Sequence, residues 1–182
     1  MKKISIALLA TSFFISCNNE KKTNEAAASP VEEKKQMVAL PYKAEYSDFS
    51  IGDQNHTKMV LDFFKMFEEN RLNDGRSMLT DSVTVDFPDG SKFSGTADSL
   101  INLGIQYRKM YGKLETKVDA CLAVHSNDKN EDWVLIWDKT YNTNEKGKVD
   151  STRGQSYWQI KNNKITYWGE YQAPLAQPPA HK

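Results

Sequence analysis

The sequence predicts an α+β domain in which two helices precede a long antiparallel sheet. Apolar residues first recur at helical spacing and then, from residue 114 onward, alternate with polar ones. Four alternating segments follow one another as far as residue 172, and the connectors between them are short and turn-like. Because connectors this short join neighbouring antiparallel strands, the order of elements predicts helices gathered on one face of a sheet.

The first predicted helix covers residues 53–73. Asp53 or Asn55 can cap its start, and Asn-Asp-Gly at 73–75 supplies a stop signal. A short helical turn over residues 76–80 is expected next. The positions of its broad apolar stripe are Met59, Val60, Phe63, Phe64 and Phe67.

A strand, a turn and a second helix come next. Residues 83–87 alternate as a half-buried strand does, and Pro88-Asp89-Gly90 has the composition of a turn. Phe93 belongs to a second short strand. Thr96 is suited to cap a helix that runs to about Tyr111 and ends at the following glycine.

The last four predicted strands cover residues 114–126, 131–141, 149–161 and 164–172. In the second of them Trp133 and Trp137 fall on one face, and Ile136 and Asp138 on the other. In the absence of a bulge, the Asn-Asn turn before the last strand places Ile160 opposite Ile165 and Tyr157 near Trp168.

Composition excludes several classes of partner. Lys plus Arg and Asp plus Glu number 24 each, so no excess of positive charge exists to attract nucleic acid. The three histidines and two cysteines lack the spacing of metal ligands, and no glycine-rich phosphate loop is found. We therefore expect neither a metal nor another cofactor.

Residues 1–17 are predicted to be a lipoprotein signal peptide. Lys2 and Lys3 precede an apolar stretch, residues 4–15, that is too short to cross a membrane comfortably. The sequence Phe-Ile-Ser-Cys that ends at Cys17 resembles a bacterial lipobox, which makes Cys17 the expected lipidation site. The alternative is an ordinary secretory signal with an incidental cysteine. On the lipoprotein interpretation the chain is lipid-anchored in the bacterial cell envelope, at the periplasmic face or the cell surface.

The remaining organisation follows from composition. Residues 18–45 are polar and of balanced charge, which predicts a flexible tether. Residues 46–173 form the predicted folded domain, of ordinary domain size. Residues 174–182 form a proline-rich tail.

Four stretches in this order resemble the NTF2-like superfamily, the cone-shaped (cystatin-like) fold of SnoaL-like polyketide cyclases and ketosteroid isomerases. They are FFKMFEENRLND, SMLTDSVTVDFPDGSKFSGTADSL, DWVLIWDKTYNTNEKGKV and YWQIKNNKITYWGEY. The resemblance covers about residues 53–172. It implies a curved antiparallel sheet wrapped around N-terminal helices, with a pocket for a small, mostly apolar molecule.

The resemblance also draws attention to Asp86. Isomerases of this superfamily carry a catalytic Asp immediately before the proline of the TVxxP stretch, and Phe87 occupies that position here. A shift of one residue along a strand reverses the side-chain direction. If Phe87 faces the pocket, Asp86 therefore faces away, unless a bulge rotates it inward.

Two other acids are candidate catalytic bases. Glu170 stands about where SnoaL-like proteins keep an acid on the last strand, and burial among aromatic rings would raise its pKa. The alternative is a rim glutamate paired with Arg153 or a lysine. Asp138 is either a pocket acid or a residue of an exposed face.

Aromatic residues concentrate in the last three strands, where they are expected to bind a ligand or, alternatively, to form ordinary sheet core. The predicted ligand-binding residues are Phe87, Trp133, Trp137, Tyr157, Trp158, Tyr167, Trp168 and Tyr171.

Three functions remain open at this point. The first, which Phe87 in the isomerase position and the lack of a metal or nucleophile motif favour, is binding of a small apolar ligand or a protein partner, without catalysis. The second is isomerase- or cyclase-type proton transfer next to a carbonyl, with Glu170, Asp86 or Asp138 as the base. The third is a dimerisation module that pairs two copies through the sheet. The side-chain directions of the three acids discriminate between the second function and the others.

Overall fold

The computed structural model describes residues 40–175. The predicted signal peptide, Cys17, most of the tether and most of the proline-rich tail lie outside this range. Within the described range, no helix has the length and apolarity that crossing a membrane requires.

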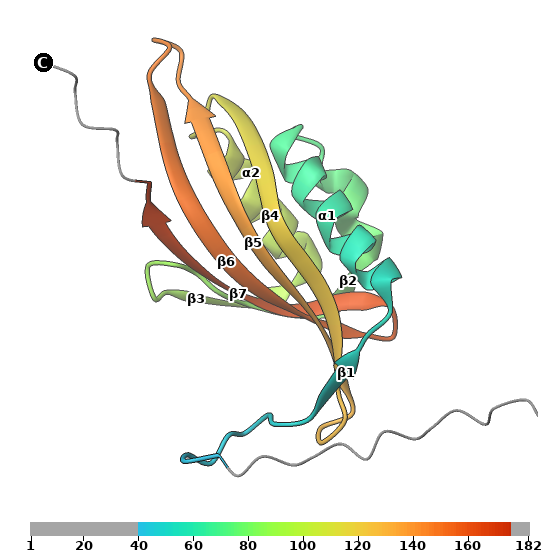
Figure 1. Cartoon of the computed structure of the whole chain (residues 1–182). Coiled ribbons are helices and arrows are strands. Elements are labelled where there is room, and N and C mark those ends of the chain that lie inside the picture. Colours follow the sequence, from blue (N-terminus) through green and yellow to red (C-terminus); the bar gives the residue numbers. More distant parts are fainter. Residues whose placement is uncertain (1–39, 176–182) are drawn as a thin grey trace, which may run out of the picture. The chain divides into compact units, whose positions relative to one another are not determined.

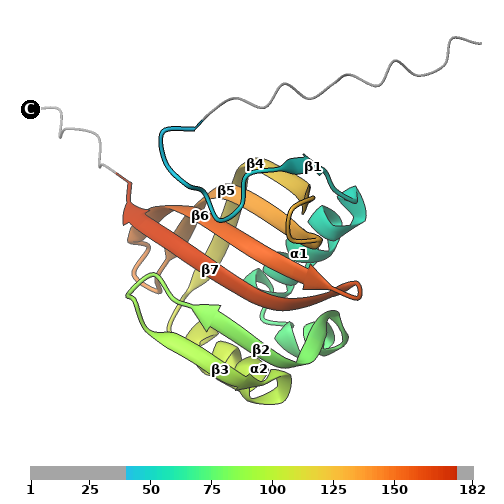
Figure 2. The same ribbon diagram turned by 90° about the horizontal axis from the view of Figure 1, so that it is seen from below.

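Seven strands form one curved, unclosed sheet (Figures 1 and 2). In spatial order they are β1 (Phe49–Ile51), β4 (Lys113–Ser126), β5 (Glu131–Thr143), β6 (Val149–Lys161), β7 (Lys164–Pro174), β2 (Leu79–Asp86) and β3 (Lys92–Thr96). The four long strands match the predicted antiparallel meander closely. The pairing of β2 with β7 is parallel, which makes the sheet mixed, and the short edge strand β1 was not predicted.

The helices lie on one side of this sheet: α1 (Gln54–Glu68), the 3-10 helix η1 (Leu72–Met78) and α2 (Ala97–Arg108) (Figure 1). Asp53 and Thr96 cap α1 and α2, as predicted. The prediction that the first helix continues to residue 73 was wrong. Asn70 takes a left-handed backbone conformation, with φ of 58°, which ends the helix and lets the buried Leu72 turn into the core.

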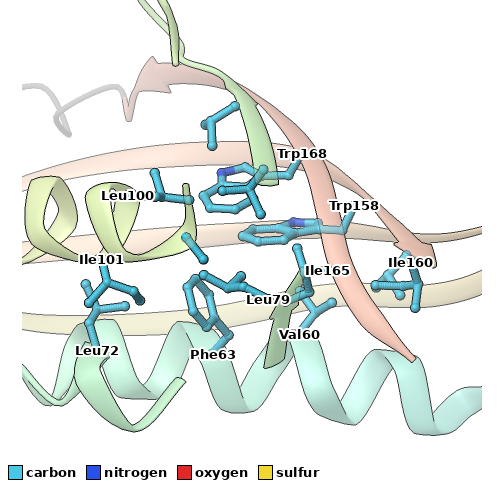
Figure 3. Packing of buried hydrophobic residues seen from close by; sticks show 14 of the residues in the cluster. Val60, Phe63, Leu72, Leu79, Leu100, Ile101, Trp158, Ile160, Ile165 and Trp168 are labelled. Atoms are coloured by element: carbon cyan, nitrogen blue, oxygen red, sulfur yellow. The ribbon is translucent and has the colours of Figure 1, made fainter. Parts of the chain in front are cut away.

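The core between helices and sheet is filled by large side chains (Figure 3). The rings of Trp158 and Trp168 stack with centroids 4.5 Å apart, and Phe63 from α1 meets both at about a T-shaped angle. Both tryptophans are at most 6% exposed. This part of the cone therefore holds the protein's own rings.

One register differs from its prediction. Asn162 and Asn163 both have positive φ and form a tight turn, and Ile160 lies opposite Ile165 as expected. A bulge after Gln159 then shifts the pairing, so Trp158 rather than Tyr157 is the partner of Trp168. The bulge is the reason that the two tryptophans stack.

The strands give the sheet two chemically different faces. On β5, the side chains of Val134, Ile136 and Asp138 are buried toward the helices, and we call this side the helix face. The alternate residues, such as Trp133 and Trp137, lie on the opposite side, which we call the open face.

Candidate active site: two acids on the helix face

Asp138 lies on the helix face, in line with the buried Ile136 on β5. It is only 7% exposed, and the Thr140 hydroxyl donates a hydrogen bond to its Oδ2 at 3.1 Å. Burial raises the pKa of Asp138, and this effect outweighs the hydrogen bond from Thr140, which lowers it. The sequence left open whether Asp138 faces a pocket or solvent, and the structure places it inside.

Glu170 lies on the same face of β7, two residues beyond Trp168. The indole Nε1 of Trp168 donates a hydrogen bond to Glu170 Oε1 at 3.1 Å, and the side chain is half-buried. Burial raises the pKa of Glu170 to about 7, and the charge of Asp138 acts in the same direction. A carboxyl group in this range can give and take protons near neutral pH.

Strand β6 lies between the two acids. Its Gly154 is paired with Asp138 and its Ser156 with Glu170. A Cβ atom at position 154 would come within 2.8 Å of Asp138 Oδ1. Because Gly154 has no side chain, the Asp138 carboxylate has room to lie over β6. Ser156 is buried, and its hydroxyl accepts a hydrogen bond from Trp158 Nε1 at 2.8 Å.

No cation in the described part of the chain forms an ion pair with either acid. Arg153, considered above as a partner of Glu170, lies on β6 one residue before Gly154 and therefore points to the open face. The half-buried Arg108 donates its hydrogen bonds to four backbone carbonyls at the ends of α1 and α2. Within residues 40–175, no positive charge therefore offsets the effect of burial on the two carboxyl pKa values.

Tyr111 is a third titratable group close to this site. Its hydroxyl donates to the hydroxyl of Tyr107 at 2.7 Å. Burial is the main cause that raises the pKa of Tyr111, and the charge of Glu170 contributes. The phenol therefore stays protonated throughout the neutral range. Sequence reasoning missed Tyr111, which lies beyond the end of α2 and has no pattern that marks it.

Asp86 lies on the open face. Its Oδ2 accepts a hydrogen bond from the Tyr167 hydroxyl at 2.7 Å, and Lys92 Nζ is 3.2 Å from Oδ1. These contacts lower the pKa of Asp86, the hydrogen bond from Tyr167 most of all. The pairing of β2 with β3 runs without a bulge to Asp86, and Phe87 packs against the core. The predicted opposition of the two side chains is confirmed.

The predicted ligand-binding aromatics divide between the two faces and do not line one pocket. Phe87, Trp158 and Trp168 pack in or against the core. The register of β5, β6 and β7 places the others on the open face: Trp133, Trp137, Tyr157, Tyr167 and Tyr171. Their roles in ligand binding stay a prediction.

Across residues 40–175, no three His, Cys, Asp or Glu side chains are grouped so that they could hold a metal ion. The ring of His56 is hydrogen-bonded to Asn163, and that of His125 to Asp132.

Comparison with known proteins identifies the fold. No family model matches the chain, and no curated protein matches it. Solved structures do: a protein assigned as a SnoaL-like polyketide cyclase from Jannaschia sp. CCS1 superposes with a TM-score of 0.55 at 12% identity, over 69% of this chain and 90% of that one. The protein has the NTF2-like fold.

Two further solved structures superpose on the chain in the same way. An LEH-like epoxide hydrolase from M. tuberculosis gives a TM-score of 0.53 at 16% identity, over 66% of this chain and 84% of its own. An NTF2-like protein of unknown function from Mesorhizobium loti gives 0.51 at 12% identity, over 68% and 97%. At these identities the likeness establishes the fold, and function has to be argued from the site.

Proposed function

We propose that the protein is an acid–base catalyst that moves a proton next to the carbonyl group of a small organic substrate. The observation that carries this proposal is the pair Glu170 and Asp138 on the helix face, without a cationic partner and with raised pKa values. A general acid or base is most effective when its pKa lies near the ambient pH, and the pKa of about 7 at Glu170 meets that condition.

The two acids suit complementary roles. Ionised Asp138 takes the proton from the carbon next to the carbonyl, while protonated Glu170 donates its proton to the carbonyl oxygen, and an enol results. Return of the proton from Asp138 to a different carbon, with return of the other proton to Glu170, gives the isomer and restores both side chains. Asp138 ionises first, since its charge is one of the causes that raise the pKa of Glu170, so Glu170 can be protonated while Asp138 is ionised.

Two of the neighbours support an acid–base function, although the proposal rests on the site. The superposed proteins include one assigned as a polyketide cyclase and one described as an epoxide hydrolase. A large apolar ligand has less support, because Trp158 and Trp168 fill the interior that was expected to be hollow. The proposed substrate is accordingly small.

The test uses 3-cyclohexenone, a small β,γ-unsaturated ketone whose isomerisation to the conjugated enone is followed by ultraviolet absorbance. We expect the full chain to accelerate this reaction and Glu170→Gln to reduce the acceleration by roughly 10²- to 10⁴-fold, the usual contribution of a general acid or base. Asp86→Asn is the matched control, since this acid lies on the opposite face. A Glu170→Gln variant as fast as the wild type, or an equal loss in Asp86→Asn, would contradict the proposal.

The cellular location is a separate proposal that rests on residues 1–17. Two lysines, a short apolar stretch and a lipobox-like sequence support lipid attachment at Cys17. We expect Cys17→Ser to release the protein from the membrane fraction of the producing bacterium into the soluble fraction, as measured by immunoblotting. Unchanged membrane association would refute lipidation at this residue. Pairing of two copies through the open face stays a prediction.

A further inference from the structure

The open face carries a hollow over three strands of the sheet. It has a volume of about 320 Å³ and lies on the side of the sheet opposite to the helices, over β5, β6 and β7. Trp137 on β5 and Tyr171 on β7 form its walls, and Gln155 and Arg153 on β6 form its floor. Asp119 lies at its edge, and Asp138 and Gly154 of the proposed active site also belong to its lining.

The spacing of the walls leaves room for one ring. Trp137, Gln155 and Tyr171 are direct neighbours across the three strands, so the two aromatic residues are two strand spacings apart, about 9.6 Å. A ring in van der Waals contact with a ring on each side needs about 7–8 Å between the outer planes. Trp137 is 37% and Tyr171 64% exposed, which leaves large apolar surface available.

A row of cations runs beside these walls. Lys117, Lys139 and Arg153 are direct cross-strand neighbours on the open face, and like charges in such positions repel one another. Asp119, the residue at the β4 bulge, binds Lys139 with both carboxylate oxygens at 2.6 Å, and Glu115 lies 3.7 Å from Lys117. Within residues 40–175, Arg153 has no acidic partner. An anion at Arg153 would therefore relieve the repulsion.

We propose that this hollow binds an acidic carbohydrate, with one uronate residue between Trp137 and Tyr171. The faces of a pyranose ring present C–H groups to the two aromatic rings, and its carboxylate reaches the guanidinium of Arg153, which can bind it through two hydrogen bonds. Sugar hydroxyls need both donors and acceptors, and the Gln155 amide supplies both, while Asp119 supplies acceptors. A flat aromatic acid would leave these polar groups unused.

The openness of the site favours a chain of sugars over an isolated small molecule. The hollow faces solvent on the exposed side of the sheet, so neighbouring sugar units can extend beyond Trp137 and Tyr171. The cation row continues from Arg153 to Lys139 and Lys117, whose charges Asp119 and Glu115 offset in part, so the row as a whole keeps an excess of positive charge.

Isothermal titration calorimetry of the full chain with tetragalacturonate tests this proposal, with neutral cellotetraose and benzoate titrated in parallel. We expect tetragalacturonate to bind and the other two not to bind measurably. Arg153→Gln should weaken binding roughly tenfold or more, because it removes a charge-assisted contact, and Trp137→Ala by a similar factor. Lys161→Gln removes an exposed charge at the far end of β6 and should leave the affinity unchanged.

Several results would overturn the proposal. They are no heat with tetragalacturonate, equal binding of cellotetraose, binding of benzoate in its place, or an affinity that Arg153→Gln leaves unchanged. Asp138 belongs to the lining of the hollow, whereas Glu170 does not. Glu170→Gln should bind tetragalacturonate as the wild type does, so failure of one proposal leaves the other standing.

Discussion

The two faces of the sheet shift the pKa of a carboxyl group in opposite directions. On the helix face, Glu170 and Asp138 lie among buried side chains without a cation, and burial raises the pKa of both. On the open face, Asp86 accepts a hydrogen bond from Tyr167 and pairs with Lys92, and its pKa is lowered. A carboxylate becomes a proton carrier on one face and a fixed charge on the other.

The aromatic residues show the same contrast. Trp158 and Trp168 stack in the core beneath α1 and stabilise the fold. Tyr171 and Trp137 stand on the open face with much of their surface exposed. Because neighbouring residues of a strand alternate in direction, one position along the chain decides whether a ring serves stability or is available for contact.

The largest expected difference between the faces is in the free energy of unfolding. Trp158→Ala should lower it by about 3–5 kcal/mol, since the variant loses a stacked core ring and gains a cavity. Tyr171→Ala removes an exposed ring and should change it by about 0.5 kcal/mol or less. Urea denaturation followed by circular dichroism measures both. An equal loss of unfolding free energy in the two variants would contradict the distinction between the faces.

The next difference is in how stability depends on pH. Burial raises the pKa of Glu170 to about 7 in the folded protein, from an ordinary value of 4.5. Between these values the folded state binds more protons than the unfolded state, so the free energy of unfolding falls as the pH rises. The total effect is at most about 3 kcal/mol. Glu170→Gln should remove this dependence and be more stable than the wild type above about pH 7.

The pKa of Asp86 is shifted in the opposite direction, so its effect on the pH dependence of stability has the opposite sign. Because its pKa is lowered in the folded state, its contribution is present above its ordinary pKa and is lost as the pH falls through the folded value. Asp86→Asn should therefore be no more stable than the wild type at neutral pH. Urea denaturation at about pH 5 and about pH 8 distinguishes the two acids. A Glu170→Gln variant with the wild-type pH slope would contradict the assignment.

Substitution of two glycines, one beside each face, gives the last comparison. A Cβ at position 154 would meet Asp138 Oδ1 at 2.8 Å on the helix face, and one at position 169 would meet the Tyr157 hydroxyl on the open face. Each Gly→Ala variant should cost about 1–3 kcal/mol through overpacking. Only Gly154→Ala should also slow the isomerisation of 3-cyclohexenone, because it displaces a carboxylate of the proposed pair. Equal rates in the two variants would count against a catalytic role of Asp138.

Much of this arrangement was predictable from the sequence, for identifiable reasons. The long strands were found because alternation and turn residues are local signals, and the opposition of Asp86 and Phe87 follows from strand geometry alone. The early end of α1 was missed because Leu72 is drawn into a core that local periodicity does not describe. Strand β1 is only three residues long and depends on its pairing with β4.

The candidate site shows the same limit. The sequence identified Glu170 and Asp138 as acids worth considering and placed Asp138 opposite to Trp137. It did not reveal which face the helices cover, and the burial that raises the carboxyl pKa values depends on this. The bulge after Gln159 likewise arises from tertiary packing, and it decides which ring stacks on Trp168.

The most direct test of the central claim is the pKa of Glu170 itself, measured by ¹³C nuclear magnetic resonance of the side-chain carboxyl group as the pH is varied, with Asp86 observed in the same titration. A value for Glu170 of about 7, together with a value for Asp86 below its ordinary range, is the predicted result. A Glu170 that titrates near its ordinary value of 4.5 would contradict both the buried acid pair and the proton transfer proposed for it.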